Sequence, residues 1–398
     1  MRLCILQNGL KNRHSHYLDE TIAWRSAVTN LNFEWSCYAH HQLPAELEKI
    51  TAAKPVFRIQ PDVIIEKDPQ LREISDFLDI AMSFAADCRK IFFSDIRSTD
   101  IILVPYATEK EILGLALWLN QIEKSHRPKI AFIVHRAEFS WQISPDRKNC
   151  KGDFRYWRYA MNRLVTASSG RILAASPDPR LADLLTSGTR QKFYPIGMPT
   201  FDTSSPPSPA PTKDVDLGMV GEFRPERGSN SIAQTLIESA IAMPETRYLL
   251  QVKTLQQAEK LQAEFAEAGR KDSLKVAVGD IDSARFLFNL RRCRWLVAPY
   301  HPERYRMRSS GIFSQAAGYG IPMLVPEGTW LADRVMEGTA RGKLVKEFNA
   351  SVIKSAIKTN HKYIQPDQES DKISCAWREK NSSQAVLRDI LNRLMVFP

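Results

Sequence analysis

Short β-rich runs alternate with longer amphipathic stretches along most of this chain, and this alternation constrains its fold more than any other feature. The pattern is typical of parallel α/β construction. It occurs in two blocks. The strands expected in the first block are Leu3–Gln7, Phe33–Tyr38, Ile101–Val104, Ile130–Val134 and Ile172–Ala175, and the second block begins with Val215–Val220. The sequence therefore predicts two α/β domains.

A proline-rich segment separates the two blocks. Residues 199–213 carry five prolines among Ser and Thr. This composition resists helix formation and packs no core, so we expect an extended linker. The chain then divides into an N-terminal domain (1–198), the linker (199–213), a C-terminal domain (214–372) and a last helical stretch (373–398). That stretch is either the final helix of the second domain or a helix that packs back on the first.

The composition is that of an ordinary globular chain. Of 398 residues, 43% are hydrophobic and 25% charged, which excludes a disordered or collagen-like protein. The six cysteines are scattered, without zinc spacing, so we expect buried or free thiols in a reducing, cytoplasmic compartment. No apolar run approaches the roughly 18–20 residues of a membrane span, and the N-terminus lacks the pattern of a secretion signal.

Basic residues outnumber acidic ones, 55 to 45, which gives a formal net charge of +10. This charge favours an anionic partner, either nucleic acid, a phosphorylated small molecule or an anionic membrane surface. Nucleic acid is the least expected of the three. The arginines gather at loop positions near strand ends, and the sequence has no helix-turn-helix, zinc or RNP signature.

The first strand of the second block ends in glycine and leads through Gly221–Gly228 toward a helix. Glycine lets backbone N–H groups at a helix N-terminus come close to a bound anion. Arg224 and Arg227 would add charge-assisted hydrogen bonds to phosphate oxygens. The alternative interpretation is an ordinary strand-to-helix loop with exposed charges.

A second segment of the same kind is Pro299–Phe313. Ser309, Ser310 and Gly311 suit the open first turn of a helix, where N–H donors and the positive end of the helix dipole would hold phosphate. Arg304, Arg306 and Arg308 precede that turn. The alternative interpretation is a basic surface loop.

These two segments resemble the C-terminal nucleotide-sugar domain of GT-B glycosyltransferases, most closely glycosyltransferase family 4 (group 1) and its relatives. The resemblance implies a GT-B fold, in which two Rossmann-like α/β domains face each other across a cleft. It implies that the donor diphosphate is bound by Gly221, Arg224, Arg227, Arg308, Ser309, Ser310 and Gly311. It further implies that Gly279, Asp280 and Ile281 form the turn that binds the base, and that Gln315 contacts the ribose.

The chain departs from the family pattern at several positions. Glu222 stands where the family has Arg, and Arg227 stands where it has Lys. The family's Glu-x7-Glu pair falls on Met307 and Gln315, so neither carboxylate is present. The amide of Gln315 still accepts hydrogen bonds, whereas the Met307 thioether does not replace a carboxylate. Glu303 is the candidate substitute carboxylate.

The N-terminal half matches the family more loosely. Residues 129–139 resemble a family strand that ends in a histidine facing the cleft, which makes His135 the candidate catalytic residue. It would hydrogen bond a hydroxyl of the donor sugar, or act as a base in an inverting enzyme; the alternative is a structural histidine. Asn8 and Gly9 resemble the loop that lies over donor and acceptor.

Taken together, these features predict a metal-independent, hexosyltransferase-like glycosyltransferase that moves a sugar from a nucleoside-diphosphate donor to an acceptor hydroxyl. Arginines and a helix N-terminus would stabilise the leaving diphosphate, so no cofactor or metal is expected. The resemblance suggests a carbohydrate or lipid-linked acceptor in cell-envelope polysaccharide or glycolipid synthesis, and an enzyme peripheral to the inner face of the membrane. The alternative is a non-catalytic or regulatory nucleotide-sugar-binding protein of the same fold.

Overall fold

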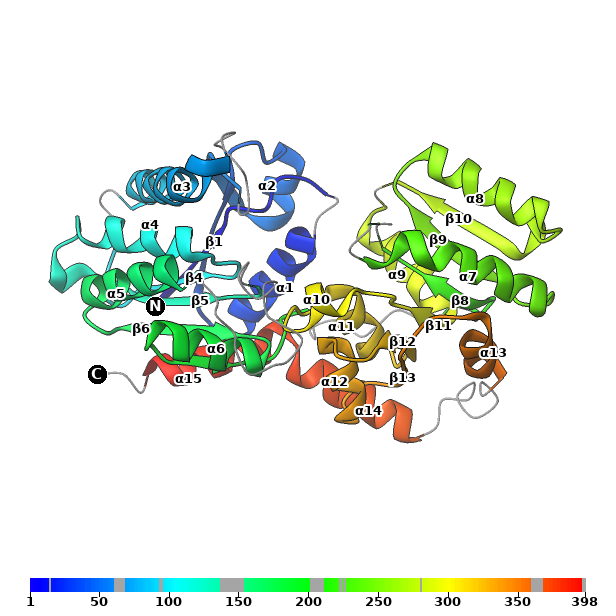
Figure 1. Ribbon diagram of the computed structural model, residues 1–398. Coiled ribbons are helices and arrows are strands. Elements are labelled where there is room, and N and C mark those ends of the chain that lie inside the picture. Colours follow the sequence, from blue (N-terminus) through cyan, green and yellow to red (C-terminus); the bar gives the residue numbers. More distant parts are fainter. Residues whose placement is uncertain are drawn as a thin grey trace. The chain divides into compact units, whose positions relative to one another are not determined.

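The computed structural model forms two compact units. It describes residues 1–13, 16–60, 69–92, 96–136, 154–200, 211–221, 224, 227–279, 281–358 and 368–395. Unit 1 comprises Met1–Ser204 and Ser382–Pro398, and unit 2 comprises Ser205–Asn381. Figure 1 shows an α/β arrangement in each unit. Most of the predicted linker, residues 201–210, lies outside the described residues.

Within the described residues of unit 1, seven parallel strands form one sheet in the order β3-β2-β1-β4-β5-β6-β7. The strands are β1 Arg2–Gln7, β2 Glu34–His40, β3 Ala53–Phe57, β4 Ile101–Val104, β5 Lys129–Ile133, β6 Ile172–Ser176 and β7 Phe193–Pro195. The strand order reverses between β1 and β4. In open parallel sheets, ligands bind at the carboxyl ends of the strands where the order reverses.

Helices cover both faces of this sheet. They are α1 His16–Asn30, α2 Ala45–Thr51, α3 Pro69–Ile91, α4 Glu109–Leu119, η1 Lys124–His126, α5 Arg155–Ser168, α6 Pro179–Thr189 and α15 Ser383–Met395. α1 and α15 pack against each other and share a core with Leu3 and Ile5 of β1. α3, α4 and α5 pack side by side (Figure 1). Of these elements, α2, β3 and α3 lie in residues 42–100, where the sequence offers no readable motif.

In unit 2, six of the described strands form a second parallel sheet in the order β10-β9-β8-β11-β12-β13. They are β8 Val215–Met219, β9 Tyr248–Val252, β10 Leu274–Val278, β11 Cys293–Val297, β12 Met323–Pro326 and β13 Gly342–Val345. Here the order reverses between β8 and β11. The carboxyl ends of these two strands are therefore the expected ligand site of unit 2.

The helices of unit 2 are α7 Ser229–Ala242, α8 Leu255–Glu267, η4 Lys271–Ser273, α9 Ser283–Arg292, α10 Pro302–Tyr305, α11 Gly311–Gly318, α12 Trp330–Met336, α13 Ala350–Lys358 and α14 Gln368–Lys380. Apolar side chains of α7, α8 and α13 share one core with the strands. α11 and α14 pack together, and the indole Nε1 of Trp377 on α14 donates to Ser314 Oγ at 3.2 Å.

The last helical stretch, expected over 373–398 as one helix, is divided in the structure into α14 and α15. Asn381 ends α14, where its side-chain Nδ2 donates to the Trp377 carbonyl at 2.8 Å. Ser382 then caps α15, since its hydroxyl accepts from the N–H of Ala385 at 3.1 Å. α14 belongs to unit 2, whereas α15 packs on α1 in unit 1.

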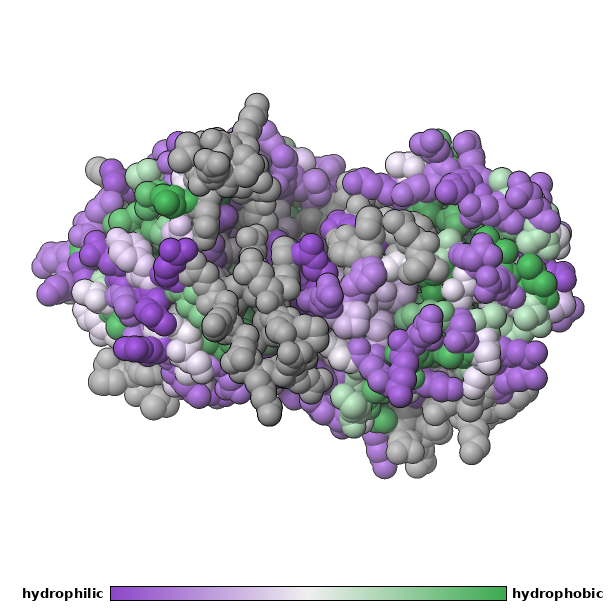
Figure 2. Space-filling view, viewed as in Figure 1, coloured by the Kyte–Doolittle hydropathy of each residue, from purple (hydrophilic) through white to green (hydrophobic). Residues whose placement is uncertain are grey.

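Within the part of the chain that the structure describes, every helix is too short or too polar to cross a membrane. On the face shown in Figure 2, hydrophilic side chains cover much of the surface and hydrophobic ones form separate patches.

Candidate functional site

The segment after β8 brings three strand ends together. The backbone N–H of Gly221 donates to Gln251 Oε1 at 2.8 Å, and Gln251 Nε2 donates to the Gly279 carbonyl at 3.4 Å. Gln251, in β9, thus links the predicted diphosphate segment to the predicted base-binding turn. We did not select Gln251 from the sequence, although a glutamine within the buried strand Tyr248–Val252 is an unusual signal.

Gly221 is required where it stands. Its φ is +107°, and a Cβ built on it would lie 2.2 Å from Ile312 Cδ1 on α11. Glycine adopts this conformation readily, whereas other residues rarely do. The loop backbone after β8 therefore packs against the side chain of Ile312, a residue of the first turn of α11.

Gly228 is the N-cap of α7 and adopts φ +71°. A Cβ there would lie 2.1 Å from the Pro299 carbonyl oxygen, so backbone rather than a flexible side chain fills that space. Gly228 therefore holds the start of α7 against the segment that follows β11.

We expect Gly228→Ala to destabilise the protein by about 1–3 kcal/mol more than Gly338→Ala, because the added methyl overpacks the site. Gly338 is a matched control: its φ is +68°, and a Cβ added there would have no atom within 4 Å. Both variants share the cost of a left-handed conformation. Urea unfolding of the two variants measures the difference, and equal midpoints and slopes would contradict the close packing at Gly228.

Tyr300 lies where the two segments expected to bind phosphate, Gly221–Gly228 and Pro299–Phe313, come together. It is 3% exposed, and its ring centroid lies 5.9 Å from Arg227 Cζ and 4.3 Å from the Tyr305 ring. Its hydroxyl hydrogen bonds with Ser310, and Arg308 Cζ lies 5.1 Å from the Tyr305 ring. Burial raises the pKa of Tyr300, while Arg227 and Arg308 oppose that rise, so the phenol stays protonated near neutral pH.

The first turn of α11 is the predicted phosphate-binding helix terminus. Ser310 is its N-cap and accepts from the Phe313 N–H at 3.3 Å. Gly311, the first residue of the helix, is exposed and Ser309 is partly exposed. The first N–H groups of a helix have no intrahelical partner and carry the positive end of its dipole. This terminus therefore offers donors to an anion.

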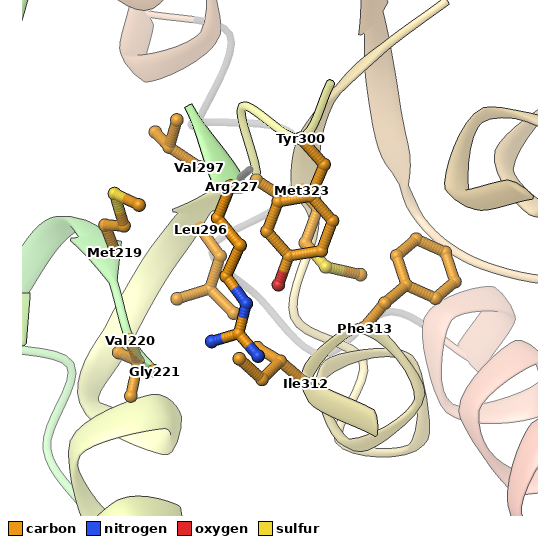
Figure 3. Close-up of a pocket in the computed structure, with 11 residues that line it drawn as sticks. Met219, Val220, Gly221, Arg227, Leu296, Val297, Tyr300, Ile312, Phe313 and Met323 are labelled. Carbon is orange, nitrogen blue, oxygen red and sulfur yellow. The ribbon is translucent and has the colours of Figure 1, made fainter. Parts of the chain in front are cut away.

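A cavity lies at these strand ends (Figure 3). Arg227, Tyr300 and Ile312 line it, and the remaining lining residues include Met219, Val220, Gly221, Val297 and Phe313. In Figure 3 the Arg227 and Tyr300 side chains lie side by side, and their polar ends approach Ile312. The cavity occupies the β8–β11 reversal, where the strand order predicts a ligand.

The other predicted residues of unit 2 lie in varied surroundings. Arg224 is exposed, and its carbonyl accepts from the Arg227 N–H at 2.9 Å. Gly279 adopts φ +81°, and a Cβ there would meet open space. Gln315 is partly exposed on α11, whereas Glu303 is exposed on α10. Ile281 is partly exposed, and Asp280 lies outside the described residues.

Unit 1 gathers its own polar cluster at the β1–β4 reversal. Asn8 is buried, and its Nδ2 donates to Glu111 Oε1 at 3.2 Å. A Cβ on Gly9 would lie 2.5 Å from the Tyr17 ring, so this loop packs directly on α1. The predicted donor/acceptor loop is thus fixed by α1 and α4.

His135 follows β5 and is held in one orientation. Its Nε2 lies 3.1 Å from the Pro105 carbonyl, and because a carbonyl only accepts, Nε2 carries the proton. Its ring stacks on Tyr106, with centroids 4.3 Å apart and 19° between the planes. Burial lowers the pKa of His135 to about 3. The imidazole is therefore neutral near pH 7, with Nδ1 as its hydrogen-bond acceptor.

Comparison with known proteins identifies the fold. The chain matches no family model and no curated protein sequence. It is similar in structure to a sucrose-phosphate synthase from Thermosynechococcus elongatus (TM-score 0.65, 14% identity, 99% of each chain covered). It is also similar to a glycosyltransferase from Rickettsia africae (TM-score 0.62, 13% identity, 100% of each chain). A third similar structure is Anabaena HepE in complex with UDP-glucose (TM-score 0.59, 13% identity, 99% of each chain).

These similarities extend over both units and confirm the predicted GT-B fold with two Rossmann-like α/β domains. Identities of 13–14% show the fold alone. The activity therefore has to be argued from the side chains at the strand ends.

Proposed function

We propose that this protein is a glycosyltransferase that takes a sugar from a nucleoside-diphosphate donor. The observation that supports this most is the β8–β11 cavity, where Arg227, Tyr300 and the start of α11 meet next to Gly221. An arginine, a neutral phenol and a helix N-terminus are donors suited to a diphosphate. We further propose, from the sequence resemblance, that the protein is related to glycosyltransferase family 4.

In the proposed reaction the bond between the sugar and the diphosphate breaks, and negative charge develops on the leaving phosphate. Donors fixed before the reaction stabilise this charge without having to reorganise. Arg227 and the first N–H groups of α11 fill this role. Arg308 lies close to them, because its guanidinium lies over the ring of Tyr305, which in turn contacts Tyr300. This arrangement makes a metal unnecessary to the proposal.

We assign His135 to the donor sugar as a hydrogen-bond acceptor. Its Nε2 is committed to Pro105, which leaves Nδ1 to accept from a sugar hydroxyl. A histidine whose pKa is about 3 is a poor proton acceptor near pH 7. The low pKa therefore favours the hydrogen-bonding role over the role of general base.

A second candidate function is nucleotide-sugar binding without transfer. Met307 is 7% exposed and apolar where family 4 has a carboxylate, and Gln315 is an amide where it has the second. In this alternative Glu303, exposed on α10, would not act on the donor sugar.

Incubation of the purified protein with a panel of nucleotide sugars separates the two functions. HepE has been solved with UDP and with UDP-glucose, so UDP-glucose is the first donor to test. We expect slow release of free nucleoside diphosphate from one donor, and faster release when a carbohydrate or lipid-linked acceptor is added. Binding of a donor without any release would favour the non-catalytic function.

We expect Arg227→Ala to weaken binding of free nucleoside diphosphate by about 1.5–3 kcal/mol, the range for hydrogen bonds to charged groups. Arg227→Lys should keep much of the affinity, because it keeps the charge but loses the planar pair of donors. Titration calorimetry with UDP and with GDP measures both effects.

Arg247→Ala is the matched control for this prediction. Arg247 precedes β9, at the amino ends of the strands, opposite to the carboxyl ends that line the cavity, and its guanidinium pairs with Asp216 at 3.9 Å. This variant loses an arginine without touching the cavity, so its affinity should equal that of the parent. Equal affinity of Arg227→Ala and the parent would remove Arg227 from the diphosphate site.

A further inference from the structure

Gln251 on β9 holds its side-chain amide between two backbone segments of unit 2. β9 lies between β8 and β10 in the sheet, and Gln251 is 7% exposed near the carboxyl end of its strand. Its Oε1 accepts from the Gly221 N–H at 2.8 Å, and its Nε2 donates to the Gly279 carbonyl at 3.4 Å. One side chain thus contacts the backbone that follows each of the two neighbouring strands.

The alternation of side chains along β9 explains where this amide lies. Tyr248, Leu250 and Val252 belong to the apolar core that the sheet shares with α7 and α8. Successive side chains of a strand point to opposite faces, so Gln251 points away from this core. It lies near the end of its strand, within reach of backbone groups that follow β8 and β10.

A glutamine amide satisfies both of these backbone groups at once. The Gly221 N–H only donates, so it meets the amide oxygen, and the Gly279 carbonyl only accepts, so it meets the amide nitrogen. The two hydrogen bonds thus fix which way the amide faces. The Gly279 N–H also donates to the Val252 carbonyl at 2.9 Å, so the turn after β10 is itself held to β9. Gln251 therefore holds Gly221 from an anchored position.

Gly221 in turn lies against the arginine that we propose binds the diphosphate. A Cβ built on Gly221 would lie 3.2 Å from Arg227 Nη1. The guanidinium therefore packs on the backbone of Gly221, in the cavity that both residues line. A movement of this backbone would change the position at which the guanidinium rests.

We infer that Gln251 is a positioning residue that holds the backbone of Gly221 and, through it, the guanidinium of Arg227. Gly221 adopts φ +107°, and glycine has wide conformational freedom, so a partner is needed to keep its backbone in one conformation. Gln251 is that partner. The Gly221 N–H is used within the protein, and a bound diphosphate finds its donors at Arg227 and α11 instead. This inference rests on the proposed function, in which a nucleoside diphosphate occupies the β8–β11 cavity.

Two backbone amides report this contact without any ligand. Of the 17 glycines in the sequence, only Gly221 and Gly279 follow a valine. Full-length protein labelled with ¹⁵N in glycine and ¹³C in the valine carbonyl therefore gives two signals in a nuclear magnetic resonance spectrum that selects ¹³C–¹⁵N peptide bonds. Gly279→Ala removes one signal and so assigns the other to Gly221, and a Cβ at Gly279 would meet open space.

The rates at which these amides exchange with deuterium test the hydrogen bond to Gly221. Gln251→Met keeps the length of the side chain and removes both hydrogen bonds. We expect the Gly221 amide to exchange at least about 10-fold faster in this variant than in the parent. The Gly279 amide should change less, because it keeps its bond to Val252. Gln251→Glu keeps an oxygen that accepts from Gly221, so its Gly221 amide should stay slow.

Parent-like exchange at Gly221 in Gln251→Met would overturn the inference. Equal acceleration of both amides would also overturn it, because a general loss of stability affects the two alike. If Gln251→Met does not fold, Gln251→Glu decides, since fast exchange at Gly221 in that variant would contradict the inference.

Calorimetry with UDP and with GDP tests the step from Gly221 to Arg227. We expect Gln251→Met to weaken nucleoside-diphosphate binding about 10-fold in the parent background, and less than about 3-fold in an Arg227→Ala background. The reason is that a residue acting through Arg227 has nothing to position once Arg227 is removed. An equal loss of affinity in the two backgrounds would overturn the inference.

Tyr248→Phe is the matched control, because it also removes a buried hydrogen bond of β9. The Tyr248 hydroxyl pairs with Ser239 Oγ at 2.9 Å, at the amino end of the strand and on its other face. This variant should keep the parent's affinity for nucleoside diphosphate and the parent's ratio of the two exchange rates. If the parent binds neither UDP nor GDP, the proposed function fails, while the two amide signals still decide whether Gln251 holds Gly221.

Discussion

Replacement of His135 by alanine should lower turnover by about 10²-fold or more while leaving the affinity for free nucleoside diphosphate nearly unchanged. The proposed interaction that this variant loses is one with the sugar, whereas the proposed diphosphate site lies in unit 2. Initial rates with the donor found in the panel, together with calorimetry using the diphosphate alone, measure the two effects separately.

His135→Asn then distinguishes the two roles of the imidazole. An asparagine carbonyl oxygen takes a position close to that of Nδ1 and accepts a hydrogen bond, but it does not act as a base. Partial recovery in His135→Asn therefore supports acceptance from a sugar hydroxyl, whereas equal inactivity of both variants supports the base. A variant that melts far below the parent would instead identify His135 as structural, since its Nε2 holds the Pro105 carbonyl.

The backbone conformation of the two segments expected to bind phosphate can be predicted because its signals are local. A glycine directly after a strand, followed by a helix, predicts a close backbone approach, and the structure gives Gly221 φ +107° and Gly228 φ +71°. The sequence places Ser310 in an open first turn, and the structure makes it the N-cap of α11. In these cases one short stretch of sequence contains all the groups that determine the conformation.

Other site residues depend on partners far along the chain, and the sequence does not reveal those pairings. Tyr300 matters because β11 lies beside β8, which places it against Arg227. Glu20 accepts a hydrogen bond from Trp24, four residues away, but its burial depends on the packing of α1 against distant segments. A single sequence gives no register between strands, so a buried carboxyl on an amphipathic helix resembles any polar residue of that helix.

The break between α14 and α15 escapes prediction for a different reason. Trp377, Val386 and Ile390 have helical spacing on both sides of Asn381, so periodicity alone predicts one continuous helix. The interruption depends on two side chains that hydrogen bond to the backbone, Asn381 and Ser382. Such residues compete with helical hydrogen bonds, and the competition is decided by packing on two different units.

Glu20→Gln should stabilise the protein at neutral and alkaline pH by an amount that grows with pH. The pKa of Glu20 is about 8 in the folded protein and near the ordinary 4.5 in the unfolded chain. Between these values the folded protein holds one proton more than the unfolded chain. Rising pH therefore lowers the parent's free energy of unfolding by about 1.4 kcal/mol per unit at this group. The loss begins near pH 4.5 and is complete near pH 8.

Glutamine does not titrate, so the variant lacks this loss, and the difference from the parent should reach about 3–5 kcal/mol by pH 8 and stay constant above it. Urea unfolding of both proteins at a series of pH values from 4.5 to 9 gives this difference directly. His135 also makes the stability depend on pH, because its pKa is lower in the folded protein than in the unfolded chain, and the fold is destabilised as the pH falls below the unfolded-chain pKa. His135 is present in both proteins, so its contribution cancels in the difference.

Asp87→Asn gives the opposite expectation and serves as the control. The Asp87 carboxylate lies 2.9 Å from Arg58 Nε and 3.3 Å from Lys90 Nζ, so its replacement removes ion pairs and should destabilise the protein. A stabilisation confined to Glu20→Gln, and rising between pH 4.5 and 8, identifies a carboxyl that is buried without a cation. A constant difference between Glu20→Gln and the parent would mean that the Glu20 carboxyl reaches water in the folded protein and is not buried as a neutral acid.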